Sequence, residues 1–115
     1  MIDPGGDASA DATLQQLARL LEERRDADPA SSYVAGLYAA GEDAILEKIG
    51  EEAAEVLRAG KSPDQAALVH EVADLWFHTL VLLASRKLGP QPVLDELRRR
   101  LGRSGMDEKA ARMQK

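Results

Sequence analysis

The segment formed by residues 63–88 constrains the fold most, because it is apolar around most of its circumference. Its hydrophobic residues recur with the periodicity of an α-helix, and the Gly-Pro pair that follows ends the pattern. A helix with so little polar surface has to be covered by other elements. We therefore expect this helix at the centre of the core, with Trp76 packed among its leucines. Ser62 is expected to cap its N-terminus, with Pro63 in the first turn.

Further helical signals flank this segment on both sides, and short loops separate them. Hydrophobic residues, mostly Ala and Leu, make up 44% of the chain, and aromatic residues only 3%. This composition is typical of helical proteins, and short connections place consecutive helices antiparallel. The sequence therefore predicts an all-α fold, a compact helical bundle of about four main helices. Besides residues 63–88, the expected helices are residues 11–25, a short helix at 33–38 that ends at Gly41, residues 42–59 and residues 92–101.

The chain has 115 residues, which is the length of one domain. We expect residues 1–10, which are small and polar, to form a disordered tail, and residues 11–115 to form the single domain. The absence of cysteine excludes disulfides and thiolate-bound metals. Residues 1–10 lack the features of a signal peptide, and the longest purely apolar run, residues 80–84, is far shorter than the roughly 20 residues of a membrane span. We expect a cytoplasmic protein with no membrane partner.

The distribution of charge is more informative than the net charge. A net charge of -5 argues against a nucleic-acid partner, because such proteins neutralise phosphates with a basic surface. Residues 86–115 nevertheless carry nine of the fifteen Lys and Arg residues and only four of the twenty Asp and Glu residues. Two interpretations stay open at this point. The basic segment is either a solvated surface or a strip that faces phosphate or a partner.

Acidic side chains interrupt the apolar stripe of the helix expected at residues 42–59. Glu52 falls within that stripe, Glu55 lies at its edge, and Glu51 lies a further step round, next to Lys48. Most acids on helices are surface charges that pair with nearby Lys or Arg. That interpretation fails for Glu52, because a carboxylate that faces the core is costly unless it is paired or binds a metal.

A second acidic pair lies on the long helix. Glu71, Asp74 and His78 form a narrow polar strip along one border of its apolar face. Antiparallel packing would bring Glu52 and Glu55 opposite Glu71 and Asp74, and such an all-oxygen set suits Mg²⁺ or Mn²⁺. A di-iron bundle would require Glu-x-x-His pairs, which the chain lacks.

The two histidines have different expected roles. His78 either positions a carboxylate or a water molecule, or is a hydrogen-bonded structural residue. His70 is expected to point to the far side of the helix and to be exposed.

These acidic stretches resemble a known enzyme family. Residues 45–56 (Ile-Leu-Glu-Lys-Ile-Gly-Glu-Glu-Ala-Ala-Glu-Val) and 71–78 (Glu-Val-Ala-Asp-Leu-Trp-Phe-His) closely resemble phosphoribosyl-ATP pyrophosphohydrolases, enzymes of histidine biosynthesis. That family belongs with the all-α, MazG-like NTP pyrophosphatases. Ser32-Tyr33 and residues 104–112 fit the narrower family, and the resemblance covers about residues 12–112.

The resemblance implies hydrolysis of phosphoribosyl-ATP to phosphoribosyl-AMP and pyrophosphate, by a homodimer whose second subunit completes the bundle. It also implies a form without the cysteine-dependent cyclohydrolase domain to which this domain is fused in many organisms. The magnesium ligands that it implies are Glu52, Glu55, Glu71 and Asp74.

Hydrolysis of a phosphoanhydride requires charge neutralisation and a positioned water molecule. Glu51 and Glu55 are the candidates that accept the proton of the water. Lys48 either binds a phosphate oxygen or pairs with a neighbouring glutamate, and Ser32 and Tyr33 are candidate substrate-binding residues. Two other functions remain open: a house-cleaning pyrophosphatase of non-standard nucleotides, and a non-catalytic helical interaction module. Further candidates for phosphate contacts, from the second subunit, are Arg98, Arg99, Arg100, Arg103 and Lys109.

Overall fold

The computed structural model describes residues 10–102, 109 and 112–113, and helices are the regular structure of this part of the chain. No strand occurs within this described part, so the predicted all-α fold is confirmed. The N-terminal tail predicted at residues 1–10 lies outside it, apart from Ala10, which begins the first helix. The elements are α2 (Ala10–Glu23), the 3-10 helix η1 (Arg24–Asp26), α3 (Tyr33–Ala40), α4 (Glu42–Gly60), α5 (Gln65–Ser85) and α6 (Gln91–Leu101).

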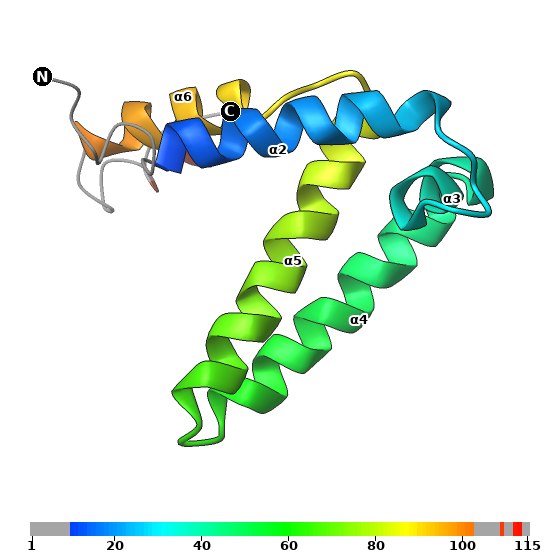
Figure 1. Cartoon of the computed structure of the whole chain (residues 1–115). Coiled ribbons are helices and arrows are strands. Elements are labelled where there is room, and N and C mark those ends of the chain that lie inside the picture. Colours follow the sequence, from blue (N-terminus) through cyan, green and yellow to red (C-terminus); the bar gives the residue numbers. More distant parts are fainter. Residues whose placement is uncertain (1–9, 103–108, 110–111, 114–115) are drawn as a thin grey trace, which may run out of the picture.

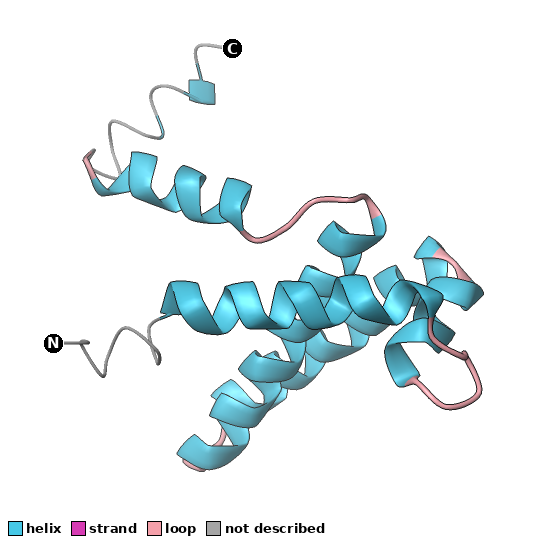
Figure 2. Cartoon of the chain, turned by 45° about the horizontal axis from the view of Figure 1, so that its top comes forward, coloured by secondary structure: helices cyan, strands magenta, loops and turns pink. Residues whose placement is uncertain are grey.

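Helices α4 and α5 form a long antiparallel hairpin. They are joined by a tight loop at one end, pack against each other, and spread apart towards the other end (Figure 1). Helix α2 crosses the other end of the hairpin, and α6 runs beside α2 after a loop that follows α5 (Figures 1 and 2). Helix α3 packs against the start of α4. The predicted antiparallel arrangement of the two acidic helices is therefore confirmed.

The buried core lies where the ends of α4 and α5 meet α2 and α3. Leu21, Ile45 and Val81 are almost completely buried there, with at most 1% of each residue exposed. The remainder of the hairpin has little cover within the chain. Trp76, which the periodicity placed in the core, is 61% exposed, so that prediction is wrong for the single chain. Periodicity identifies an apolar face but does not specify which element covers it.

Helix α5 begins two residues later than predicted, because Asp64 and not Ser62 caps it. The Asp64 carboxylate accepts a hydrogen bond from the backbone N–H of Ala67 at 3.1 Å. The Ser62 hydroxyl instead accepts from the N–H of Asp64 at 3.1 Å and shapes the preceding turn. At its other end the helix stops at Ser85, before the predicted residue 88. Lys87 there adopts a left-handed conformation with φ of 60°.

Gly41 joins α3 to α4 and explains the abrupt change of direction between them. Its φ is 102°, a backbone conformation that side chains with a Cβ atom rarely adopt. Its N–H also donates to the carbonyl of Leu37 at 3.1 Å, which ends α3 where the sequence predicted. This junction fixes the position of α3 relative to the first turns of α4.

By length and composition alone, α5 is also apolar enough to cross a membrane. Core helices of soluble proteins meet the same criterion, so this is weak evidence. Only His78, Val81 and Ala84 of this helix are buried within the chain.

Candidate active site

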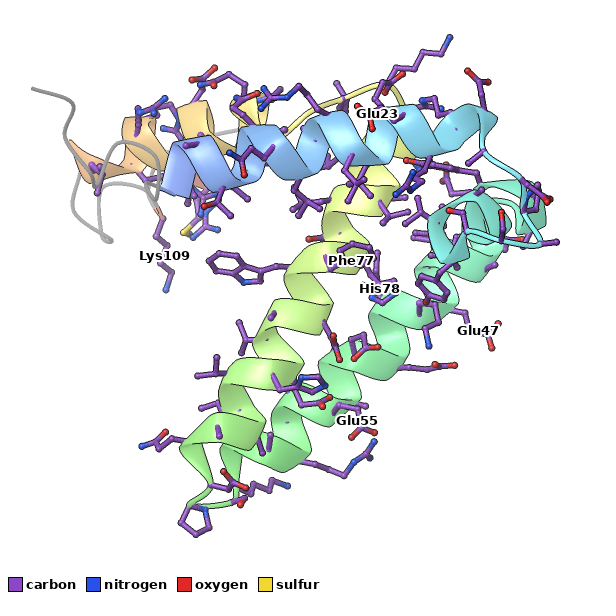
Figure 3. The ribbon with its side chains drawn as sticks, viewed as in Figure 1. Glu23, Glu47, Glu55, Phe77, His78 and Lys109 are labelled. Carbon is purple, nitrogen blue, oxygen red and sulfur yellow. The ribbon has the colours of Figure 1, made fainter. Side chains whose placement is uncertain are left out.

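The acidic residues of α4 differ in how far they face the hairpin. The Glu52 side chain is only 12% exposed, whereas those of Glu51 and Glu55 are 54% and 46% exposed. This ranking agrees with the helical periodicity, which placed Glu52 inside the apolar stripe. The Glu52 carboxylate lies near the His78 ring, with Oε1 4.0 Å from Nδ1. Figure 3 shows His78 between α5 and α4, and Glu55 further along α4.

On α5, a histidine joins the predicted pair of acids. His70 Nε2 lies 3.3 Å from Asp74 Oδ2 and 3.9 Å from Glu71 Oε1. One ligand atom from each of these residues lies within 4.8 Å of the others, a spacing that suits a metal ion. His70 is exposed as predicted, but it does not point to the far side of the helix. A separation of four residues is about one helical turn, which brings His70 next to Asp74.

Two cations neutralise the outer carboxylates of α4. The Arg58 guanidinium donates a hydrogen bond to Glu55, and this bond, with the charges of Glu55 and Glu71, raises the pKa of Arg58. At the other end, the Lys48 ammonium group donates to Glu51 Oε1 at 3.3 Å, and this bond is the main cause of the raised pKa of Lys48. Lys48 therefore forms an ion pair with Glu51, one of the two roles that the sequence left open for it.

The four predicted metal ligands lie on the two facing helices but not in a single ligand cluster. Glu71 and Asp74 are close together, Glu52 faces His78, and Glu55 contacts Arg58. Within the described residues, the only set whose ligand atoms all lie within 4.8 Å contains His70 and neither glutamate of α4.

Helix α3 brings Tyr33 to this surface. The Tyr33 hydroxyl is 2.8 Å from Nε2 of His78, although 45 residues separate the two in the sequence. Lys48 also lies within electrostatic range of Tyr33, whose charge contributes to the raised pKa of Lys48. Ser32, the other predicted substrate-binding residue, is the N-cap of α3, and its hydroxyl accepts from the Ala35 N–H at 3.2 Å.

His78 is a hydrogen-bonded residue at the centre of these contacts. It is 5% exposed, and its Nδ1 is 2.9 Å from the backbone carbonyl of Asp74. The sequence placed His78 on the same strip as Asp74 but gave no sign of Tyr33 as its partner. Only the fold of α3 onto the hairpin brings these two side chains together.

The basic side chains of α6 pair within their own helix. Arg99 and Arg100 both bind Glu96, and these hydrogen bonds lower the pKa of Glu96 to about 2. Arg98 contacts Asp95 at 3.4 Å. Such pairs are the arrangement expected of a solvated basic surface. Arg103 and most of residues 104–112 lie outside the described residues.

Lys109 is exposed and lies on the other side of α5 from Glu55 (Figure 3). Within one chain it is therefore remote from the carboxylates.

Comparisons with known proteins point to one enzyme family. A family model described as phosphoribosyl-ATP pyrophosphohydrolase matches residues 14–101. A relative from Chromobacterium violaceum, named phosphoribosyl-ATP pyrophosphatase, is 60% identical over 99 residues, which cover 86% of this chain and 92% of the relative. A relative of the same name from Methylococcus capsulatus is 54% identical over 99 residues, which cover 86% of this chain and 94% of the relative.

Proposed function

Because the chain belongs to the phosphoribosyl-ATP pyrophosphohydrolase family, we propose that it hydrolyses phosphoribosyl-ATP to phosphoribosyl-AMP and pyrophosphate, a step of histidine biosynthesis. The observation that carries the proposal is the position of Glu52. This nearly buried carboxylate on α4 lies in the hairpin whose other helix presents Glu71 and Asp74. Glu52 also lies within the 99-residue alignments with two relatives named phosphoribosyl-ATP pyrophosphatase, which are 54% and 60% identical to this chain.

We propose Mg²⁺, with Mn²⁺ as a substitute, as the cofactor. The donor set fits it, because carboxylate oxygens are the preferred ligands of both ions. Glu55 now contacts Arg58, and it would have to leave this pair to reach the ion. An exposed ion pair contributes little to stability, so the loss of the Glu55–Arg58 contact on metal binding costs little free energy. The proposed ligands are Glu52, Glu55, Glu71 and Asp74.

The remaining residues support hydrolysis of a phosphoanhydride. When bound, the metal neutralises charge on the phosphoryl oxygens and orients a water molecule. Glu51 or Glu55, both about half exposed, accepts the proton of that water. Lys48, whose hydrogen bond to Glu51 favours its charged form, binds a phosphate oxygen. Tyr33 lines the adjacent surface, where Ser32 also contributes to substrate binding.

We propose that the protein is a homodimer that covers the apolar side of the hairpin. A groove of about 640 Å³ lies between α2, α5 and α6, and its lining is almost entirely apolar. Trp76 and Leu97 in this lining are 61% and 51% exposed. Exposed apolar surface of this kind is typical of protein interfaces. Lys109 and the α6 arginines of the second copy are the proposed source of further phosphate contacts.

The same proposal assigns the enzyme to the cytoplasm, with a small charged nucleotide as its substrate. Nucleic acid is an unsuitable partner for a chain of net charge -5. A lipid bilayer is an unsuitable environment for α5, because its first half carries Glu71 and Asp74. The apolar face of α5 is instead the surface that the second subunit would cover.

Pyrophosphate release from three substrates tests the activity. Phosphoribosyl-ATP, ATP and dUTP are supplied separately with Mg²⁺, and we expect turnover of phosphoribosyl-ATP well above that of the two plain nucleotides. Comparable turnover of all three would favour the house-cleaning pyrophosphatase. No release from any of them, with thermal unfolding unchanged by Mg²⁺ and nucleotide, would favour the non-catalytic interaction module.

A further inference from the structure

His70 lies beside the two carboxylates of α5 that belong to the proposed metal site. Its Nε2 atom is 3.3 Å from Asp74 Oδ2 and 3.9 Å from Glu71 Oε1. One ligand atom of each of these three residues lies within 4.8 Å of the others. The four proposed ligands are all carboxylates, so His70 would add a nitrogen atom to an all-oxygen set. The imidazole is either the partner of an exposed ion pair or a further ligand of the ion.

The spacing of His70 and Asp74 suits two ligands of one ion. The two residues are four positions apart on a continuous helix, so their side chains share one face. The paired histidines of the His-Glu-x-x-His motif, which bind zinc from a single helix, have the same spacing. Residues 70–74 read His-Glu-Val-Ala-Asp, which places Asp74 at the position of the second histidine.

The distance between the two side chains leads to the same conclusion. Two donor atoms about 2.1 Å from one ion are about 3.0 to 3.4 Å apart when the angle between them is about 90° to 110°. The 3.3 Å between His70 Nε2 and Asp74 Oδ2 falls within this range. An ion between these two atoms therefore requires no movement of the backbone.

Side-chain exposure places His70 on the solvent side of the cluster. Glu71 is 20% exposed, Asp74 is 40% exposed and His70 is 71% exposed. Glu71 is also near enough to α4 for its charge to contribute to the raised pKa of Arg58. The three side chains thus follow one another from the hairpin outwards, and His70 approaches an ion held by the two carboxylates from its solvent side.

A nitrogen ligand changes which ion such a site prefers. Mg²⁺ binds oxygen ligands and retains several water molecules. Imidazole is instead a good ligand of transition ions such as Zn²⁺. An exposed histidine beside the carboxylates therefore has little effect on Mg²⁺ and a large effect on Zn²⁺.

We propose that Nε2 of His70 is a further ligand of the metal site, and that it increases the preference of this site for divalent transition ions such as Zn²⁺ over Mg²⁺. The inference rests on the proposed function, because it assumes the ligand roles of Glu71 and Asp74. It adds a fifth ligand to the four carboxylates and assigns to it the choice between two classes of ion.

Binding of the two ions to the metal-free full-length chain, without substrate, tests the inference. Calorimetry gives the affinities for Zn²⁺ and for Mg²⁺ in the unsubstituted chain and in His70→Gln. Loss of a residue that only supports a ligand costs about 10- to 100-fold in metal affinity, so loss of a ligand should weaken Zn²⁺ binding at least about tenfold. Binding of Mg²⁺ should be nearly unchanged. The change in the ratio of the two affinities is decisive, because carboxylates alone also favour transition ions to some extent.

Two variants on the same helix provide the controls. Val69→Gln introduces the same side chain at a neighbouring residue that is 68% exposed, and it should leave both affinities unchanged. Asp74→Asn should weaken the binding of both ions. A ratio that His70→Gln leaves unchanged, with both affinities raised, lowered or unaltered together, would overturn the inference, because His70 would then only pair with Asp74. A change of the ratio in Val69→Gln would overturn it as well.

Nitrogen NMR of the imidazoles identifies the ligand directly. The chain has two histidines, so the signals absent from His70→Gln belong to His70. Addition of Zn²⁺ should shift the Nε2 signal of His70 strongly. No shift, or a shift confined to His78, would overturn the inference. Failure to release pyrophosphate from phosphoribosyl-ATP would instead overturn the proposed function, and the measurements of Zn²⁺ and Mg²⁺ binding would stand.

Discussion

Replacement of Glu52 by glutamine tests whether the nearly buried carboxylate binds the metal. The amide preserves the size of the side chain and removes its charge. Two charges about 4 Å apart interact by about 4 kcal/mol at an effective dielectric constant of about 20, and each 1.4 kcal/mol or so is a factor of ten. Some of this is regained, since the amide oxygen still coordinates weakly. We therefore expect Mg²⁺ affinity and pyrophosphate release to fall between about 100-fold and 1000-fold.

The same substitution should have the opposite effect on the protein without metal. Glu52 shares the hairpin with further carboxylates, so removal of its charge should raise the thermal midpoint in the absence of Mg²⁺. Addition of Mg²⁺ should then raise the midpoint of the unsubstituted protein more than that of the variant. Glu47→Gln is the control, because Glu47 points away from α5 on the outer side of α4 (Figure 3). Near-normal turnover of Glu52→Gln would refute the ligand role.

Three further substitutions or measurements address other parts of the chain. Asp64→Ala removes the N-cap of α5 and should lower the free energy of unfolding by about 1 kcal/mol, measured by urea denaturation; an unchanged value would mean that the cap is dispensable. Trp76→Glu places a charge in the apolar groove and should yield monomers in light scattering; a persistent dimer would locate the interface elsewhere. Glu96 should titrate at a pH of about 2 in NMR spectra. Because folding lowers its pKa from 4.5, its stabilising contribution is present above pH 4.5 and is lost as the pH falls through 2; a midpoint near 4.5 would show that the arginine contacts are absent in solution.

The sequence predicted the helices well because each carries its own local signal. The periodicity of α4 and α5 and the breaks at Gly41 and the Gly-Pro pair defined the hairpin and its antiparallel arrangement. Both ends of α5 were predicted wrongly, and each error has its own cause in the local backbone geometry. Ser62 and Asp64 are both good capping residues, and the choice between them depends on the geometry of the loop. The left-handed conformation of Lys87 had no signal, because such a conformation is unusual for lysine.

The candidate site was predicted less completely, because its contacts join residues that are far apart in sequence. The inward position of Glu52 followed from periodicity, which is a property of one helix. The contact of Tyr33 with His78 depends on how α3 packs on the hairpin, and no local pattern encodes it. For Trp76 the sequence predicted the apolar character of the position but not its surroundings. The residues that the structure describes leave this side chain 61% exposed.

The Arg58 guanidinium offsets part of the negative charge that the acids bring to the hairpin. This guanidinium contacts Glu55 on its own helix, and the charge of Glu71 on α5 also raises its pKa. It therefore places a positive charge on the same side of the hairpin as the proposed metal site. Both residues of the Arg58–Glu55 pair are substantially exposed, so the interaction is weak and exchangeable. A divalent ion would compete with Arg58 for Glu55. Replacement of Arg58 by methionine should consequently increase the affinity of the protein for Mg²⁺, and should slightly lower its stability when Mg²⁺ is absent. Calorimetry that finds unchanged or weaker Mg²⁺ binding would show that Arg58 does not compete with the ion.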